Sequence, residues 1–227
     1  MLKCEICGNN DFVFTKVLWD ELISAWQLSP YEVEYIDHQQ GQRCQSCGCN
    51  LRSIAIAKAI VDAYDFEGTL NEFVQSDSAA KLKVLEINEA GDLSSILKKI
   101  PGHQLITYPD YDMMHLSFPD NSWDLVIHSD TLEHVPDPMC ALSQCRRILS
   151  EKGRCIFTIP IVVDRISRFR TGLSKSYHGI PTADDEDNLV HTEFGMDFWK
   201  YVIKAGFQKC TIHTLRYPTA FAIEASG

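Results

Sequence analysis

Hydrophobic and polar positions change their spacing near residue 80 of the chain. Before that point, apolar residues within 51–64 recur at helical intervals, and a second short helix is predicted over 69–75. Beyond it, short apolar runs alternate with helical patterns, which is typical of a parallel sheet with crossover helices. The predicted strands are 83–87, 104–108, 123–128 and 154–159, and the predicted helices are 93–100, 139–149 and 196–205.

The chain ends in a pattern of a different kind. Two further strands are predicted at 209–217 and 219–224, joined by a turn at Pro218. Because so short a connection can join only antiparallel strands, the pair predicts a hairpin that closes the parallel sheet. We therefore expect an α/β domain over 81–227, a helical connector over 51–80 and a small separate module over 1–50.

The composition fits this organisation and narrows the class of partner. The 227 residues are enough for one full domain and a small module, and 45% hydrophobic with 23% charged residues is typical of a globular protein. A formal net charge of −10 disfavours nucleic acid, whose phosphates are normally met by clustered positive charge. The longest apolar stretch, 155–163, is too short to span a bilayer, and no apolar segment follows Met1. We expect a cytoplasmic protein with no membrane partner.

Four of the nine cysteines form two similar motifs, Cys4-x-x-Cys7-Gly and Cys44-x-x-Cys47-Gly. A reducing cytoplasm disfavours disulfides, and two such turns can direct four thiolates at one tetrahedral Zn²⁺. The zinc would be structural, because four sulfur ligands leave no open coordination position. Reduced thiols without a metal and a redox pair are the alternatives.

The segment between the two cysteine motifs carries several aromatic residues. We expect Trp19, Trp26 and Tyr35 to pack as a helical insert against the metal module, as core side chains and not as a ligand platform. Two nearby side chains, Cys49 and His38, rank second as metal ligands.

A short loop follows the first predicted strand of the α/β domain, where doubly wound sheets bind their ligands. The loop is a degenerate form of a glycine-rich turn, because Gly91 remains, Ala90 is small and Asn88 replaces a glycine. Asn adopts a positive φ more readily than other non-glycine residues, so we expect that conformation at Asn88. Taken alone, the loop fits a nucleotide-like cofactor and an ordinary strand-to-helix turn equally well.

A long run of residues downstream favours the cofactor. It reads Asp-Met-Met-His-Leu-Ser-Phe-Pro at 112–119, Trp-Asp-Leu-Val-Ile-His-Ser-Asp-Thr-Leu-Glu-His-Val at 123–135 and Phe-Thr-Ile-Pro at 157–160. In this order the run resembles the class I S-adenosylmethionine-dependent methyltransferases, in the branch called type 11. The chain is also similar to a narrower group of predicted methyltransferases with an N-terminal cysteine module and distal motifs, here Tyr-His-Gly at 177–179 and His-Thr-Glu-Phe-Gly at 191–195. The resemblance implies a Rossmann-like class I methyltransferase fold with S-adenosylmethionine as cofactor.

The resemblance also implies which residues would hold the cofactor. Glu86 and the backbone of 88–91, from Asn88 through Ala90 to Gly91, would hold its methionine portion. Asp110 is placed to bind the ribose hydroxyls, and Asp112 precedes the segment in which the family has its adenine-contacting acid. In the family a helix and a strand usually separate these two acids, so we expect this part of the fold to be abbreviated.

Three further residues are expected near the cofactor. Met113 would cover an adenine face or, as the alternative, fill a gap in the core. His128 and Ser129 end the strand at which the family brings the reactive methyl group close to the acceptor.

A general base is useful when the methyl acceptor is a hydroxyl group. His134 is the first candidate, and His178 or His191 would reach in from the C-terminal insertion. The alternative for His134 is a loop-orienting hydrogen bond to the backbone. The insertion at 162–190, with Arg165, is the expected acceptor-binding region, and a solvated surface loop is its alternative.

The leading hypothesis from the sequence is an S-adenosylmethionine-dependent methyltransferase acting on a small-molecule acceptor. The alternative is a catalytically inactive, methyltransferase-like protein whose zinc module mediates interactions. An NAD-type oxidoreductase is disfavoured, because the loop at 88–91 lacks Gly-x-Gly-x-x-Gly. The acceptor, the atom methylated and the oligomeric state stay open, since one fold hosts many substrates.

Overall fold

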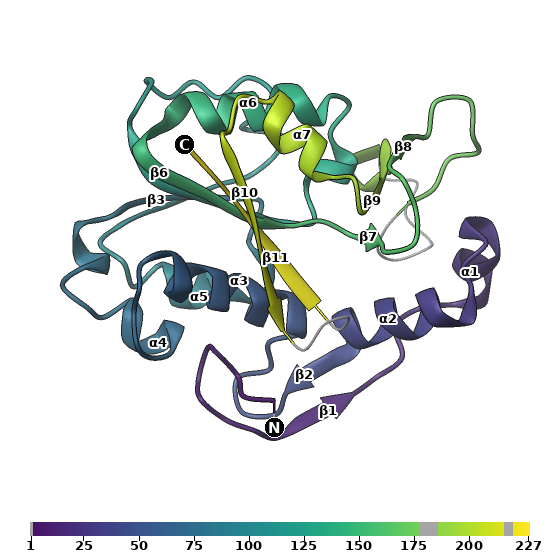
Figure 1. Ribbon diagram of the computed structural model, residues 1–227, viewed down its shortest axis with the longest axis horizontal. Helices are drawn as coiled ribbons and strands as arrows, with labels where there is room; N and C mark the ends of the chain where they lie inside the picture. Colours follow the sequence, from purple (N-terminus) through teal and green to yellow (C-terminus); the bar gives the residue numbers. More distant parts are fainter. Residues whose placement is uncertain (1, 178–185, 216–219) are drawn as a thin grey trace.

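The computed structural model describes residues 2–177, 186–215 and 220–227, and its centre is a six-stranded sheet. The strand order is β10-β11-β6-β5-β3-β4 (Figure 1). Strands β4, β3, β5 and β6 run parallel, and β11 runs antiparallel to both β6 and β10. The bounds are β3 (Lys83–Ile87), β4 (Gly102–Ile106), β5 (Trp123–Ser129), β6 (Leu149–Thr158), β10 (Lys209–Leu215) and β11 (Ala220–Ser226). The predicted parallel sheet with a closing antiparallel pair is confirmed, and the predicted turn at Pro218 lies outside the described residues.

Helices cover both faces of the sheet because side chains alternate along each central strand. One core joins α3 (Leu51–Ala63), α4 (Leu70–Phe73) and α5 (Ser94–Leu97) to Val84, Leu125 and Ile156. The other joins α6 (Pro138–Ile148) and α7 (Trp199–Lys204) to the next residue of each strand, Leu85, Val126 and Phe157. Short 3₁₀ turns lie at Ala79–Lys81, Gly91–Leu93, Leu132–His134 and Glu186–Asn188.

The connection between β4 and β5 is shorter than in a regular doubly wound sheet. Residues 107–122 are all described, and they form turns without a helix, as the spacing of the two acids predicted. Strand β4 ends two residues before its predicted end because the backbone leaves the ladder at Thr107. The Tyr108 N–H donates to Asn88 Oδ1 at 2.8 Å, and the Tyr111 N–H donates to Thr107 O at 3.0 Å.

The N-terminal module is built on two short antiparallel strands, β1 (Phe12–Phe14) and β2 (Gln42–Cys44). Between them, α1 (Asp20–Trp26) and α2 (Pro30–Gly41) form the predicted helical insert, which we call the α1–α2 insert. A capping box between Ser29 and Glu32 starts α2, with Pro30 in its first turn. The module is continuous with the α/β domain, because Cys4 and Ile6 belong to the same buried cluster as α3.

The aromatic residues of the insert pack elsewhere than predicted. Trp26 is buried against Val162 and Val190, and its Nε1 donates to Ser176 Oγ at 2.8 Å. Tyr35 is buried in the cluster that contains α6 and α7. The expectation that these side chains pack against the metal module is wrong for both, because Trp26 packs on residues that follow β6 and Tyr35 packs into the core beside α6 and α7.

Residues after β6 form a small second sheet. Its strand order is β7-β9-β8, with β7 (Ile161–Val162) parallel and β8 (Arg168–Phe169) antiparallel to β9 (Thr192–Gly195). This sheet lies beside the α1–α2 insert (Figure 1). Among the helices that the structure describes, none has the length and apolar character needed to cross a bilayer.

Candidate functional site

The two cysteine motifs fold into matching turns that bring four sulfur atoms together. In the first, the Gly8 N–H donates to Cys4 O at 2.8 Å; in the second, the Gly48 N–H donates to Cys44 O at 2.9 Å. Both glycines have a positive φ, +81° and +76°, which such a turn requires. The antiparallel β1–β2 pair joins the turns, so sequence repeats far apart in the chain meet face to face.

The sulfur atoms of Cys4, Cys7, Cys44 and Cys47 all lie within 4.8 Å of one another. The Cys4–Cys47 and Cys7–Cys44 sulfur pairs are each 3.6 Å apart. Tetrahedral zinc with Zn–S bonds of about 2.3 Å places its sulfurs at a similar separation, so the four residues fit a structural site.

The environment of these thiols also fits a cation. Burial raises the pKa of the Cys4 and Cys47 thiols, although backbone N–H groups of the turns donate to both sulfurs. Four thiolates this close together would also repel one another, so a cation between them would stabilise the ionised cluster. The second-ranked ligands lie outside the cluster: Cys49 Sγ faces the carbonyl of Asp92 at 3.9 Å, and His38 stacks on Phe14.

The loop after β3 has the backbone conformation that its degenerate glycine pattern predicts. Asn88, Glu89 and Gly91 have φ values of 55°, 47° and 60°, so the positive φ expected at Asn88 is confirmed. The Asn88 side chain anchors the turn after β4, as its hydrogen bond from Tyr108 shows. A Cβ on Gly91 would lie 2.6 Å from Ser53 Oγ, so α3 leaves no room for a side chain at this point.

Glu86 is fully buried beneath this loop, and protein groups occupy both of its oxygens. Oε1 accepts from the Ala90 N–H at 2.7 Å and from the Ser94 hydroxyl, and Oε2 accepts from His103 Nε2 at 2.7 Å. Burial acts to raise the pKa of Glu86, but the hydrogen bonds from His103 and Ser94 lower it overall. The carboxylate therefore holds the loop from below, and its predicted contact with the cofactor stays a prediction.

The predicted ribose and adenine residues lie on the abbreviated turn after β4. Asp110 is exposed there. Asp112 accepts from the Met114 N–H at 2.8 Å and pairs with His115 Nδ1 at 2.9 Å. Met113 is buried in the core that contains α6 and α7, which is its alternative interpretation.

The end of β5 places its residues at different depths. The His128 ring is fully buried and stacks on Phe157 at 4.7 Å, and burial lowers its pKa to about 3, so the ring is neutral. Ser129 Oγ lies 2.8 Å from Thr158 Oγ1 at the end of β6. Asp130, the next residue, pairs with Arg52 of α3.

A cavity of about 310 Å³ lies between the α1–α2 insert and the ends of β5 and β6. We call it the insert pocket. Its apolar walls come from Val17, Leu18, Trp19, Leu22, Trp26, Leu28, Ile36, Pro160, Ile161 and Val162. Its polar side consists of Gln39, Gln40, Arg52, Asp130, Glu133, His134 and Asn188.

His134 reaches this pocket and also makes the backbone contact that was its alternative role. Its Nδ1 donates to Leu189 O at 3.1 Å, and its Nε2 lies 3.5 Å from Glu133 Oε1. His191 lines a neighbouring cavity of about 160 Å³ with Arg170. His178 lies outside the described residues.

Comparison with known proteins finds a family similarity in the central part of the chain. Residues 68–157 match the family described as "Methyltransferase domain". This segment is similar to a methyltransferase domain. The match agrees with the methyltransferase resemblance and includes the loop at 88–91 and the end of β5.

Several known proteins are similar to part of this chain. A ubiquinone biosynthesis O-methyltransferase from Thiobacillus denitrificans is 26% identical over 146 residues, which is 62% of this chain and 56% of that protein. An uncharacterised protein from Methanocaldococcus jannaschii is 44% identical over 48 residues, 21% of each chain. A crystal structure of a methyltransferase from Thermotoga maritima, described as a possible histamine N-methyltransferase, aligns with 75% of this chain and 97% of its own at 16% identity and a TM-score of 0.39. The chain spans about half the length of the ubiquinone-pathway relatives it matches.

Sequence reasoning missed the residues that come to the methyltransferase domain from outside it. Arg52 lies in the first turn of α3, and burial lowers its pKa to about 10 despite nearby Glu133, so it stays charged at neutral pH. The signal for Arg52 in the sequence is weak, because Lys58 and Asp62 are also charged residues of this helix. The pocket-lining residues of α1 and α2 could not be predicted from the sequence, because apolar side chains in a helix are equally typical of an ordinary hydrophobic core.

Proposed function

We propose that this protein is an S-adenosylmethionine-dependent methyltransferase acting on a small-molecule acceptor, with a structural zinc ion in its N-terminal module. The methyltransferase-domain match over 68–157 carries this proposal, because it includes the strand ends that form the site. The insert pocket at the ends of β5 and β6 adds a cavity of small-molecule size.

The cofactor site would lie at the carboxyl ends of β3 and β4, which are adjacent parallel strands. The backbone of Asn88 to Gly91 would hold the methionine portion, and exposed Asp110 would accept hydrogen bonds from the ribose hydroxyls. S-adenosylmethionine supplies a methyl group on a positively charged sulfur. Displacement at such a carbon depends mainly on alignment, so the chief task of this chain is to position the acceptor.

An oxygen atom is the acceptor that two observations favour. His134 lines the insert pocket, and its tautomer is set by Nδ1–H donation to Leu189 O, so Nε2 is the ring atom that could take a proton. The ubiquinone-pathway relatives are named as O-methyltransferases.

Calorimetric titration of S-adenosylhomocysteine into the full chain tests the proposal. We expect a dissociation constant in the micromolar range, about −8 kcal/mol. Asp110→Ala should weaken binding about tenfold, while Asp77→Ala, an exposed acid remote from the strand ends, should leave it unchanged. Absence of binding to a folded, metal-loaded sample would refute the proposal and support the inactive, zinc-bearing interaction protein instead.

The zinc ion has its own test. Elemental analysis of protein purified without added metal should give about one zinc per chain. A content below about a tenth of an equivalent, with all nine thiols titratable, would refute the structural zinc site.

A further inference from the structure

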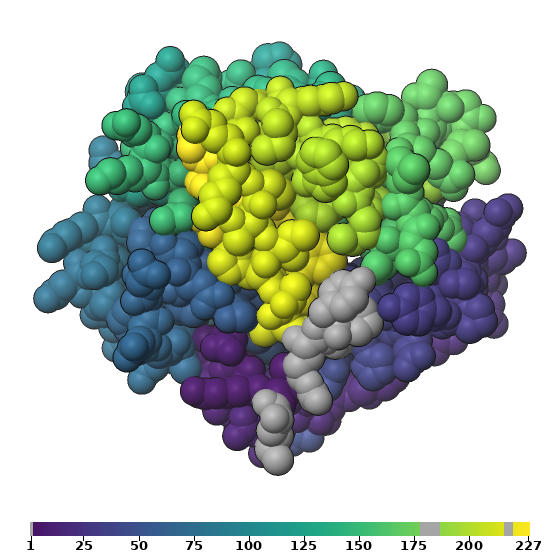
Figure 2. Space-filling view, viewed as in Figure 1, coloured from purple at the N-terminus to yellow at the C-terminus, as the bar shows by residue number. Residues whose placement is uncertain are grey.

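The insert pocket is assembled from parts of the chain that are far apart in sequence. The α1–α2 insert supplies one wall, and the ends of β5 and β6 with β7 supply the other. Figure 2 shows the indigo atoms of the insert against the green atoms that follow β6. The pocket therefore exists only when the insert is held in this position.

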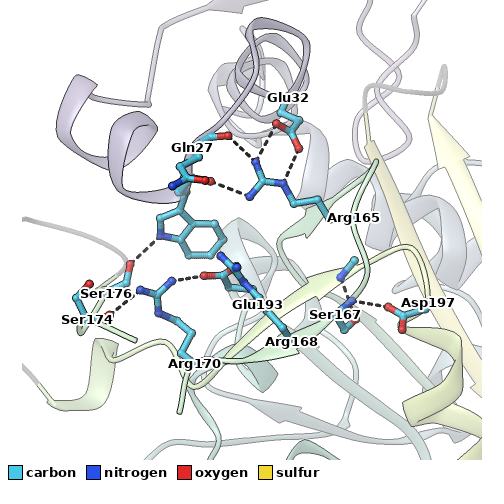
Figure 3. A network of polar contacts seen from close by, with 12 residues as sticks. Gln27, Glu32, Arg165, Ser167, Arg168, Arg170, Ser174, Ser176, Glu193 and Asp197 are labelled. Atoms are coloured by element: carbon cyan, nitrogen blue, oxygen red, sulfur yellow. Dashed lines mark hydrogen bonds and ion pairs between the residues drawn. The ribbon is translucent and has the colours of Figure 1, made fainter. Parts of the chain in front are cut away.

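Arg165 holds the insert there (Figure 3). Its Nε donates to Glu32 Oε1 at 2.7 Å, and its terminal nitrogens donate to Glu32 Oε2 at 3.0 Å, to Trp26 O at 2.7 Å and to Gln27 O at 2.8 Å. One guanidinium thus binds the first turn of α2 and the carboxyl end of α1. Its own backbone is anchored, because Met196 N–H donates to Arg165 O at 2.9 Å.

Trp26 makes a second attachment from the insert to the segment after β8. Its Nε1 donates to Ser176 Oγ, and the Arg170 guanidinium lies 5.6 Å from its ring centre. Arg170 is held in turn by Glu193 of β9 and by Ser174 O (Figure 3). The indole is therefore fixed in orientation, with one part left to line the pocket.

The charged groups of the pocket lie together on one side and are mostly acidic. Arg52 pairs with Asp130, and the Glu133 carboxylate lies beside His134, whose Nε2 is 3.5 Å from Glu133 Oε1. An anionic ligand would have to displace Asp130 from Arg52 or bring a second negative charge next to Glu133, and both are unfavourable. A neutral ligand meets neither cost.

We propose that the insert pocket binds the methyl acceptor, and that this acceptor is a compact, uncharged, ring-containing hydroxyl compound. The ring would lie against the wall formed by Trp19, Leu22 and Trp26, and the hydroxyl would point to Glu133 and His134. The volume, about 310 Å³, is at the lower end of the range for small-molecule sites, so the acceptor is small. This inference rests on the proposed function, because it assigns the acceptor to that same site.

The first experiment measures binding of 4-propylphenol to the full chain saturated with S-adenosylhomocysteine, by calorimetry or saturation-transfer NMR. We expect a submillimolar dissociation constant. The matched probe 4-propylbenzoate has the same ring and tail but a negative charge, and it should bind at least tenfold more weakly. Equal or tighter binding of the benzoate would overturn the inference.

A second experiment locates the bound probe. Leu22→Trp adds bulk to the pocket wall and should weaken 4-propylphenol at least tenfold without changing the affinity for S-adenosylhomocysteine. Ile23→Trp, the adjacent residue of α1 that does not line the pocket, is the matched control and should leave both affinities unchanged. Leu18→Trp adds bulk from the loop before α1 and replaces Leu22→Trp if that variant does not fold.

The two proposals fail in different ways. If S-adenosylhomocysteine does not bind, the proposed function is refuted. If S-adenosylhomocysteine binds but neither bulky variant changes the affinity for 4-propylphenol, the insert pocket is not the acceptor site and only this inference is refuted.

Discussion

Replacing Arg165 with alanine should loosen the α1–α2 insert and destabilise the whole protein. The substitution leaves the Glu32 carboxylate, which is only 6% exposed, without its bidentate partner. It also removes donors from the last carbonyls of α1. Removing one member of a buried ion pair typically costs about 3–5 kcal/mol. The Arg165 side chain is 26% exposed, so water replaces part of the lost interaction and we expect about 2–3 kcal/mol.

The assay is thermal and urea denaturation followed by circular dichroism. For a chain of this size, about 2–3 kcal/mol corresponds to a fall in Tm of roughly 5–10 °C. Arg168→Ala is the matched control, because its side chain is 53% exposed and its partner Glu193 keeps Arg170. The control should cost less than about 1 kcal/mol.

The pH dependence of the Arg165 effect follows from its partner. Burial acts to raise the pKa of Glu32, but hydrogen bonds from Arg165 and Ser29 lower it overall. A carboxyl with a lowered folded-state pKa stabilises the protein above its ordinary pKa, and that stabilisation is lost as the pH falls through the folded-state value. The difference between wild type and Arg165→Ala should therefore be full at pH 7 and shrink below about pH 4.

Two results would refute this reasoning. One is a loss below about 0.5 kcal/mol for Arg165→Ala, which is the size expected of an ordinary surface substitution. The other is a double variant, Arg165→Met with Glu32→Leu, that is less stable than Arg165→Ala. Removing both charges should instead recover stability, because no buried carboxylate is left unpaired.

Three further predictions concern the other sites. Cys44→Ser should reduce the zinc content to near zero by elemental analysis and lower Tm, because one of four ligands is lost; unchanged zinc would exclude Cys44 as a ligand. Gly91→Ala should lower the free energy of unfolding in urea by about 1–3 kcal/mol. It should also weaken the binding of S-adenosylhomocysteine in calorimetry, since Gly91 has a φ of 60° and the new Cβ would lie 2.6 Å from Ser53 Oγ. Wild-type values in both measurements would show that the loop adapts to the new side chain. His213→Gln should destabilise the protein at pH 6 but not at high pH. Burial acts to lower the pKa of His213, but hydrogen bonds to Glu224 and Asp62 raise it overall. A raised folded-state pKa gives a stabilisation that is full below about pH 6.5 and is lost as the pH rises through the folded-state value. A stability difference between wild type and His213→Gln that grows with pH would contradict this prediction.

The sequence by itself determined the features that depend on neighbouring residues. Strand β3 occupies the predicted range because its apolar run is bounded by turn residues, and Asn88 adopts the positive φ that its place in the loop requires. The cysteine turns form because Gly8 and Gly48 permit them. In each case the physical cause lies within a few residues along the chain, so a local pattern is sufficient to predict it.

Only the tertiary structure decided which surfaces meet. Nothing near Trp26 in the sequence indicates that its indole donates to Ser176, and nothing near Glu32 indicates Arg165 as its partner. Glu86 and His128 could be placed on their strands from the sequence, but their burial depends on what packs above them. An apolar or charged pattern shows that a side chain needs a partner without specifying which one, because that choice is made by segments brought together across the whole chain. The insert pocket arises from such contacts, and for that reason the sequence pointed to the cofactor loop and not to the pocket.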